Sequence, residues 1–444
     1  MNNSTSTLKL LEVFQKRFPN FGTNKSREIF RLINEISKIE KVSFNKILSL
    51  LEPTNYQKIK NALLQRRYPK TFHKNSLNAY YLPKYEIDLY KKADVLQKKF
   101  YPKNIYYEKD ATNNELFTKT KALFKNATFK EISCLKDFTK ENSFTLTDYN
   151  NRCDNLLLVK EKHDFFKKCP CSQNVVSCGY SIMNLGMGCI YDCTYCFLQR
   201  YQNVYGIIIP YNIDDYLAND KIIASTKGFF NYNRIGSGEF TDSLIFDDIT
   251  NFSKKIINYF KHKKNIFFEF KTKSTNIHTL LSCGGRENIV IAWSVNSKKM
   301  TVENEFKTPL IQERLFAAKK CALAGFSTAF HFDPVIYYDS WKQGYKETID
   351  MIFDIVPNTS IKWISIGTLR MPTTQKTVIE NRFPQTDILN GELLLDKDFK
   401  LRYASILRIE IYKYLLQYIK SKKSKAIIYL CMEDSNIWEA VFNS

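Results

Sequence analysis

The chain has 444 residues, of which 44% are hydrophobic, so it is long enough for two domains or one large barrel with additions. No apolar run of about 18 residues occurs, which excludes a membrane-spanning helix, and the first residues lack the layout of a secretory signal. Eleven cysteines without such a signal indicate a reducing, cytoplasmic location. The net charge of +21 favours a polyanionic partner such as nucleic acid, although a lysine-rich proteome would give the same excess.

Residues 1–97 are predicted to form a separate basic helical domain. The first 100 residues contain 20 Lys and Arg against 8 Asp and Glu. Helical spacing and capping residues predict helices over 26–39, 43–51 and 54–67. A DNA-contacting helix pair would explain the basic side chains of the last helix, but so would two packed helices with a solvated basic face. These side chains are Lys58, Lys60, Arg66 and Arg67.

From about residue 98, strand-like and helical segments alternate, which predicts an α/β domain over 98–444. The predicted strands are 104–108, 129–133, 207–209, 265–270, 288–295, 328–332 and 363–366. The predicted helices are 114–124, 247–259, 312–324 and 343–355. This alternation implies a parallel sheet with crossover helices, either open or closed into a barrel.

Three cysteines, Cys189, Cys193 and Cys196, follow the spacing C-x3-C-x2-C. Three thiolates can hold three irons of a [4Fe-4S] cluster and leave the fourth iron able to bind a small molecule. A zinc site usually has four ligands, commonly as two C-x2-C pairs, and a disulfide would leave one of the three cysteines over. The spacing therefore favours an iron–sulfur cluster.

Polar residues near predicted strand ends are candidates for binding a ligand beside this cluster. Gly238 would let the backbone approach a ligand closely, and Glu239 could accept a hydrogen bond from an ammonium group. Lys273 could pair with a carboxylate. Ser294 and Asn296 alternate onto one face of a strand, where a hydroxyl and an amide suit a ribose. Each of these residues could equally be an ordinary turn, surface or strand-end residue.

The cluster motif, with an aromatic residue before its third cysteine, resembles that of the radical S-adenosylmethionine (SAM) enzymes. The wider order of motifs is similar to that of the spore photoproduct lyase family, over about residues 99–440. The matching segments are 189–199, 272–273, 294–297, 324–326, 334–341, 367–370 and 429–433. The resemblance implies a partial (β/α)6 TIM-like barrel over 98–444, with residues 1–97 as an additional α-helical domain.

The resemblance also implies the residues of the site. Cys189, Cys193 and Cys196 would ligate the [4Fe-4S] cluster, and Tyr195 would lie beside the adenine of SAM. Lys273, Ser294 and Asp333 would contact SAM, and Gly238-Glu239 matches a Gly-Glu pair that often contacts its amino group in radical SAM enzymes. The implied reaction is reductive cleavage of SAM to a 5′-deoxyadenosyl radical, which abstracts hydrogen from the substrate.

Two positions depart from the family pattern. Glu239 stands about where the family has the cysteine that returns hydrogen to the product radical, and Phe197 replaces a tyrosine thought to assist. No cysteine occurs between Cys196 and Cys283, so Cys283 is the candidate donor, or else a bystander thiol.

Because the family's type enzyme repairs a thymine dimer, we expect DNA as the substrate and a flavodoxin or ferredoxin as the electron donor. A protein or small-molecule substrate is the alternative. A non-catalytic iron–sulfur protein that binds nucleic acid is a third interpretation.

Three further cysteines, Cys169, Cys171 and Cys178, precede the cluster motif. Thiols so close together in sequence could bind a second cluster or another metal. Scattered thiols without a shared role are the commoner situation in a reducing compartment.

Overall fold

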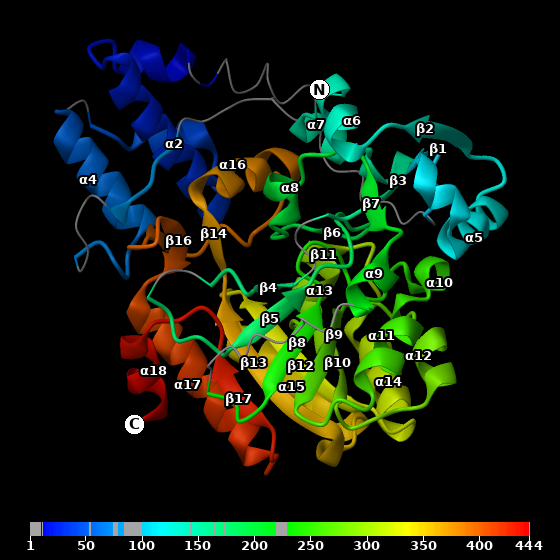
Figure 1. The fold of residues 1–444 in the computed structure, drawn as a ribbon. Coiled ribbons are helices and arrows are strands. Elements are labelled where there is room, and N and C mark those ends of the chain that lie inside the picture. Colours follow the sequence, from blue (N-terminus) through cyan, green and yellow to red (C-terminus); the bar gives the residue numbers. More distant parts are fainter. Residues whose placement is uncertain are drawn as a thin grey trace. The chain divides into compact units, whose positions relative to one another are not determined.

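The computed structural model describes residues 10, 12–52, 55–73, 79–83, 100–142, 144–162, 166–171, 174–218 and 229–443. The chain divides into two compact units: Met1–Ala93 with Leu369–Leu407, and Asp94–Thr368 with Arg408–Ser444 (Figure 1). The sequence-based division assigns 369–407 to the second domain, whereas the structure groups this segment with the first. The boundary predicted at residue 97 lies outside the described residues.

Helices and a small antiparallel sheet form the described part of the first unit. Ser43 and Asn55 cap two of the helices by accepting hydrogen bonds from the amides of Lys46 and Lys58. The helices are α2 (Thr23–Glu40), α3 (Phe44–Ser49) and α4 (Tyr56–Arg67), and they lie where the sequence predicts them. The segment 369–407 adds β14 (Arg370–Pro372), α16 (Thr373–Arg382), β15 (Leu393–Leu395) and β16 (Lys400–Tyr403).

A buried ion-pair network joins the two chain segments of this unit. Arg31 on α2 pairs with Glu35 at 2.9 Å and with Glu380 on α16 at 2.7 Å. Glu35 also pairs with Arg67 on α4 and with Lys376 on α16. Burial raises the pKa of Glu35, but the charges of Lys376, Arg67 and Arg31 outweigh this effect and hold it well below its usual value. The network explains why segments far apart in sequence form one unit.

The basic side chains of α4 are largely neutralised within this unit. Lys60 pairs with Glu28 at 2.6 Å, Arg66 pairs with Glu40 at 2.5 Å, and Arg67 belongs to the buried network. Packing between helices therefore accounts for three of the four basic residues that suggested a nucleic-acid contact. A nucleic-acid contact by this domain stays a prediction.

The second unit contains a four-stranded parallel sheet in the order β2-β1-β3-β7. Its strands are β1 (Asn104–Glu108), β2 (Thr128–Ile132), β3 (Asn155–Val159) and β7 (Ile207–Pro210), with α5 (Glu115–Leu123) and α6 (Leu135–Glu141) in the crossovers. Three of these strands were predicted. The alternation of segments did not indicate that they form a sheet of their own, because strand partners are not encoded in local periodicity.

An eight-stranded sheet in the order β17-β13-β12-β10-β9-β8-β5-β4 forms the main core of this unit. Its parallel strands are β5 (Tyr180–Met183), β8 (Asn233–Ser237), β9 (Ile266–Thr272), β10 (Ile289–Ser294), β12 (Ser327–Val335), β13 (Ile361–Thr368) and β17 (Ile427–Leu430). The edge strand β4 (Phe166–Lys168) pairs antiparallel with β5. Crossover helices are α11 (Phe252–Phe260), α12 (His278–Cys283), α14 (Ile311–Leu323), α15 (Trp341–Ile355) and α17 (Ser405–Ser421). The sheet curls into a partial barrel with helices outside it, so the predicted mixed α/β class is confirmed (Figure 1).

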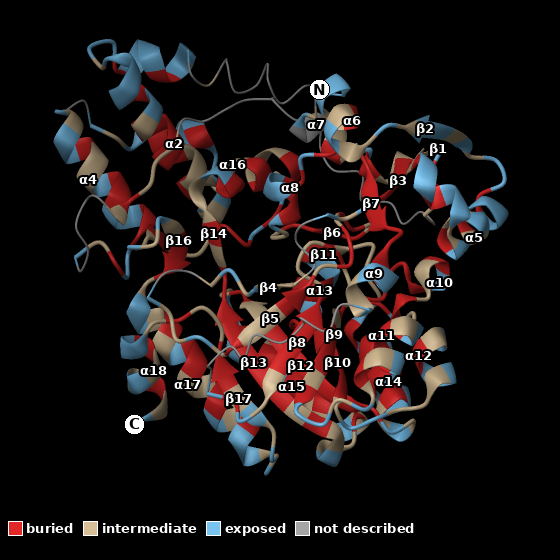
Figure 2. Ribbon diagram, in the orientation of Figure 1, coloured by how far each residue is buried: buried red, intermediate tan, exposed pale blue. Residues whose placement is uncertain are grey.

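Burial follows this arrangement. Every residue of β10 is buried, as expected for a strand covered on both faces, and Figure 2 shows the same for the central strands. Successive parallel strands bring the loops that follow them to one edge of the sheet.

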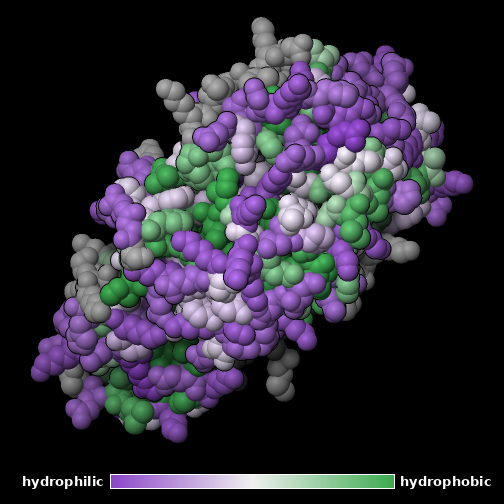
Figure 3. Space-filling model, turned by 90° about the horizontal axis from the view of Figure 1, so that it is seen from below, coloured by the Kyte–Doolittle hydropathy of each residue, from purple (hydrophilic) through white to green (hydrophobic). Residues whose placement is uncertain are grey.

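No helix in the described ranges is long and apolar enough to cross a membrane. The face of the molecule shown in Figure 3 is mostly hydrophilic.

Candidate functional site

The three predicted cluster ligands lie on the loop that follows β5, here called the cluster loop (residues 184–197). Cys189 and Cys193 are buried and Cys196 is half-buried. Gly188 has φ of 100°, and a Cβ at this position would lie 2.8 Å from Cδ1 of Ile207 on β7. The positive φ is the stronger reason for a glycine here, because the Cδ1 methyl group could move aside.

A buried arginine holds the backbone of the cluster loop. Arg152 donates from Nε to the carbonyl oxygen of Cys189 at 2.8 Å and from Nη2 to that of Tyr191 at 2.7 Å. It also donates to the carbonyl of Tyr149 and lies 3.5 Å from the carboxylate of Asp192. The planar guanidinium fixes these acceptors relative to one another. Arg152 was not predicted from the sequence, because it lies 37 residues before its nearest acceptor in the loop and belongs to no motif.

Further contacts fix the middle of the cluster loop. Its short strand β6 (Asp192–Cys193) pairs with β11 (Glu305–Phe306). The amide of Thr194 donates to the carbonyl of Asn304 at 2.8 Å, and the two side chains bond at 3.0 Å. Nε2 of Gln199 donates to the carbonyl of Thr194 at 2.7 Å. The thiols are thus presented by a backbone that is held on both sides.

The donor set suits an iron–sulfur cluster with one open iron, since three sulfurs on one loop can bind three irons. Burial raises the pKa of all three thiols, while the charge of Lys273 lowers that of Cys193 and Cys196. Buried thiols of this kind ionise when they bind a metal. Among the described residues, no three Cys, His, Asp or Glu side chains stand in ready coordination geometry. The thiols would therefore turn toward a bound cluster while the clamped backbone stays in place.

A group of charged and polar side chains lies against the cluster loop. The Tyr195 hydroxyl donates to Glu305, which also pairs with Arg314 at 2.6 Å. The Lys273 ammonium lies 5.7 Å from the centre of the Tyr195 ring. Burial lowers the pKa of Lys273, but the charges of Glu305 and Cys193 outweigh it and raise that pKa, so Lys273 is a cation beside the loop. Glu305 and Arg314 were not predicted, because the pairing of β11 with β6 brings Glu305 here and Arg314 reaches it from α14 (Ile311–Leu323).

Asp242 ties the loop after β8 to the end of β9. Its carboxylate accepts hydrogen bonds from the Thr272 hydroxyl and from the Lys273 amide, both at 2.6 Å. In the same loop, Gly238 has φ of 97°, and a Cβ there would lie 2.7 Å from the carbonyl oxygen of Lys271. The close approach of β9 is thus sufficient reason for a glycine at position 238, whether or not a ligand binds there. Asp242 was not predicted as a site residue.

Glu239 is paired with a lysine of the chain itself. Its carboxylate lies 2.8 Å from Nζ of Lys167 on β4, and the same ammonium lies 4.2 Å from the centre of the Phe240 ring. Glu239 therefore does accept an ammonium group, as its chemistry suggests. A carboxylate has two oxygens that can accept hydrogen bonds, and a contact between Glu239 and the amino group of SAM stays a prediction.

The structure brings the remaining predicted SAM contacts to the carboxyl edge of the sheet. Ser294 ends β10 and Asp333 lies near the end of β12. The amide of Asn296 is used within the fold, since it donates to the carbonyl of Pro334 at 3.1 Å and accepts from the Tyr345 hydroxyl at 2.6 Å. These bonds fit the alternative of an ordinary residue after a strand, and a contact between Asn296 and SAM stays a prediction.

Cys283 is not brought to this group. It ends α12, where its thiol donates to the carbonyl of Thr279 at 3.2 Å. Because α12 leads into β10, its last residue lies at the amino edge of the sheet, opposite the cluster loop. A role for Cys283 as hydrogen donor has no support in this placement.

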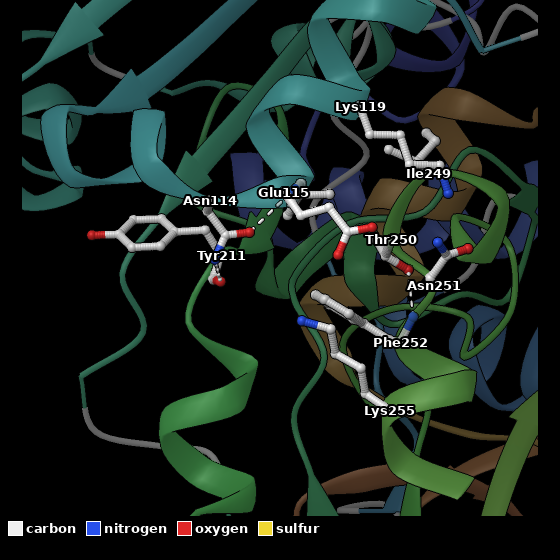
Figure 4. A pocket seen from close by; sticks show the side chains of 10 residues that line it. Asn114, Glu115, Lys119, Tyr211, Ile249, Thr250, Asn251, Phe252 and Lys255 are labelled. Atoms are coloured by element: carbon white, nitrogen blue, oxygen red, sulfur yellow. Dashed lines mark hydrogen bonds between the residues drawn. The ribbon is translucent and has the colours of Figure 1, made fainter. Parts of the chain in front are cut away.

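A pocket outside this set of residues lies between α5, α10 (Asp247–Thr250) and α11 (Figure 4). On one side, the Asn114 side chain donates to the carbonyl of Tyr211 at 2.8 Å. Lys255 lines the other side and pairs with Asp214. The described residues that line it include none of those predicted to bind the cluster or SAM, so this pocket is not part of the candidate site.

Residues 100–436 match a family model described as spore photoproduct lyase. The chain is also similar to three curated proteins named spore photoproduct lyase. The protein of Clostridium acetobutylicum is 27% identical over 207 residues, which cover 45% of this chain and 60% of the relative. Those of Geobacillus sp. and Bacillus subtilis are 25% and 24% identical, covering 66% and 69% of this chain and 85% and 88% of the relatives.

A solved structure gives the same result at the level of the fold. A mutant of spore photoproduct lyase with bound AdoMet and dinucleoside spore photoproduct superposes with a TM-score of 0.61 at 22% identity. The match covers 76% of this chain and 100% of the other. The curled sheet of the second unit is therefore an architecture shared with that enzyme.

Proposed function

The chain belongs to the spore photoproduct lyase family of radical SAM enzymes, and we propose that it cleaves SAM reductively and directs the resulting radical at DNA. One observation carries this proposal: Cys189, Cys193 and Cys196 lie on a loop that Arg152 clamps beside the cation Lys273. When bound, a [4Fe-4S] cluster would supply the electron for SAM cleavage, after receiving it from a flavodoxin or ferredoxin.

The residues beside the cluster loop would bind and orient SAM. Lys273 keeps its proton because of Glu305, so it can pair with the carboxylate of the methionine moiety. The Tyr195 ring, held by its bond to Glu305, would lie beside the adenine. Ser294 and Asp333 add hydrogen-bonding groups at adjacent strand ends.

Two features support nucleic acid as the substrate. The net charge of +21 favours a polyanion, and one solved relative is complexed with dinucleoside spore photoproduct. A lesion in duplex DNA would have to be flipped out to reach residues at the mouth of a barrel. Binding should then weaken steeply as salt rises, because phosphate contacts release counterions.

Radical chemistry on a protein or small molecule is the second candidate, favoured by one observation. Where the family has its hydrogen-donating cysteine, this chain has Glu239 in an ion pair with Lys167. A carboxylate lacks the weak S–H bond of a thiol, and Phe197 lacks a hydroxyl. A repaired product would therefore take its hydrogen from another donor.

The first experiment tests SAM cleavage. Anaerobic reconstitution should give about four irons per chain, and reduction with SAM should yield 5′-deoxyadenosine. Cys193→Ala should lose both properties, whereas Cys134→Ser, outside the candidate site, should keep them. If the reduced, iron-loaded protein leaves SAM intact, the proposal is wrong.

The second experiment separates the two substrates. A dinucleoside photoproduct labelled with deuterium at the abstracted position should transfer the label into 5′-deoxyadenosine. Unlabelled 5′-deoxyadenosine, formed at the same rate with and without the dinucleoside, would instead favour a protein or small-molecule substrate.

A further inference from the structure

Four cysteines outside the cluster loop meet where the two edges of the curled sheet come together. Cys169 and Cys171 follow β4, Cys178 precedes β5, and Cys431 follows β17. β4 and β17 are the outermost strands of the sheet. These four residues, here called the seam thiols, are all half-buried.

Backbone contacts join the two edges at this place. The amide of Val176 donates to the carbonyl of Glu433 at 2.9 Å, and Val175 forms an antiparallel bridge with Asp434. The amide of Cys431 donates to a carbonyl of β13 at 2.8 Å. The segment between β4 and β5 therefore lies against the turn after β17, which brings Cys431 to the other three cysteines.

The thiols themselves lie close together. The Cys169 and Cys171 thiols are hydrogen-bonded to each other, and Cys431 and Cys178 lie within electrostatic range of Cys169. The bond to Cys171, then burial and the neighbouring thiols, raise the pKa of Cys169. The Arg234 guanidinium lies within electrostatic range of Cys178. Four thiols gathered at one place from three chain segments can share one metal ion.

We propose that the seam thiols bind one Zn²⁺ ion in a tetrahedral site that fastens the two edges of the sheet. Four thiolates complete the coordination of zinc, which is typical of structural sites. Two sulfurs at 2.3 Å from one zinc lie about 3.8 Å apart, a separation that suits hydrogen-bonded thiols such as those of Cys169 and Cys171. A second cubane cluster would place each sulfur on a different iron. As in the cluster loop, the side chains would rotate toward the metal, because no ready ligand set exists among the described residues.

The zinc site would also steady one contact of the candidate active site. Lys167 lies on β4, two residues before Cys169, and pairs with Glu239 beyond β8. An ion bound after β4 would hold this edge strand against β5. The proposal does not depend on SAM cleavage, because none of its ligands belongs to the cluster loop.

The test is the metal content of the full chain, purified anaerobically without added metal. We expect one zinc per chain by elemental analysis, with or without iron on the cluster loop. Cys431→Ser and Cys171→Ser should each lose zinc. Cys283→Ser, a half-buried thiol outside both groups, should keep it. Cys193→Ala should lose iron and keep zinc, which distinguishes this inference from the proposed function.

Several outcomes would overturn the zinc site. They are wild-type protein without zinc, zinc retained by Cys431→Ser, about eight irons per chain in place of zinc, and a Cys169–Cys171 disulfide in metal-free protein. Should the serine variants fail to fold, Co²⁺ exchanged into the wild type must show the visible bands of a tetrahedral thiolate site. Their absence would also reject the proposal.

Discussion

The chain carries two groups of thiols that differ in number and in their neighbours. The cluster loop carries three thiols, and the charge of Lys273 acts on two of them, Cys193 and Cys196. Arg152 clamps the backbone of this loop. The neighbours that act on Cys169 among the seam thiols are other thiols. Three thiols suit a cluster that leaves one iron open to an anionic ligand, whereas four thiols suit a closed metal site. The Arg234 guanidinium acts on one of these four, Cys178. If this comparison holds, changes at one group should leave the metal of the other untouched.

Arg152→Met should have the largest effect and should act on the cluster loop alone. It leaves two loop carbonyls without their buried donor and removes one of the cations beside the buried carboxylate of Asp192, which also lies 3.6 Å from Lys307. The free energy of unfolding should therefore fall by about 3–5 kcal/mol. Iron retention should fall with it, while zinc stays. Urea unfolding and metal analysis measure both. Arg286→Met, at an exposed arginine, is the control; equal stability of the two variants would contradict the clamp.

Lys273→Met should leave both metals in place and weaken SAM binding. The loss of a half-buried charged partner for the SAM carboxylate should cost about 2 kcal/mol, or roughly a 30-fold higher Kd. Calorimetry of SAM binding to iron-loaded protein measures this change, with the exposed Lys298→Met as control. An unchanged Kd would remove Lys273 from the SAM site, and lost iron would show that it acts on the cluster instead.

The pH dependence of the free energy of unfolding should reveal the contribution of Glu305, which we expect to be smaller than that of Arg152. Burial raises its pKa, but Arg314 and Lys273 outweigh burial and hold it below the usual value. The folded-state pKa is thus depressed, so the stabilisation is present above the unfolded pKa of about 4.3 and is lost as pH falls through the folded value. The stability difference between metal-free wild type and Glu305→Gln should therefore shrink on acidification. A difference that grows would contradict the pairing.

Local patterns were enough to predict much of the fold. The strands expected at 265–270, 288–295, 328–332 and 363–366 correspond to β9, β10, β12 and β13, because β-branched and aromatic runs between turns are visible in short windows. The cluster motif is equally local. The clamp by Arg152 and the pairing of Tyr195 with Glu305 could not be predicted, since their partners lie 37 to 110 residues apart.

The same limit applies to the grouping of 369–407 with the first unit, which depends on ion pairs between Arg31, Glu35 and residues more than 340 positions away. Three of the seam thiols were noticed for their spacing. The fourth, Cys431, is recognised only when the sheet curls and β17 reaches the segment before β5.

Lys167→Met should have the smallest effect on stability. Lys167 lies on β4, two residues before the seam thiol Cys169, and it pairs with Glu239. The Lys167–Glu239 pair is partly exposed, so its loss should change the free energy of unfolding by about 0.2–1 kcal/mol. Zinc and iron should both stay, because the backbone of β4 is held by its pairing with β5 and by the ion after it. Glu239 would then be free to accept the amino group of SAM, so the Kd for SAM should fall rather than rise. Weaker SAM binding with both metals retained would show that Lys167 itself holds SAM, and loss of zinc would show that the seam depends on this side chain.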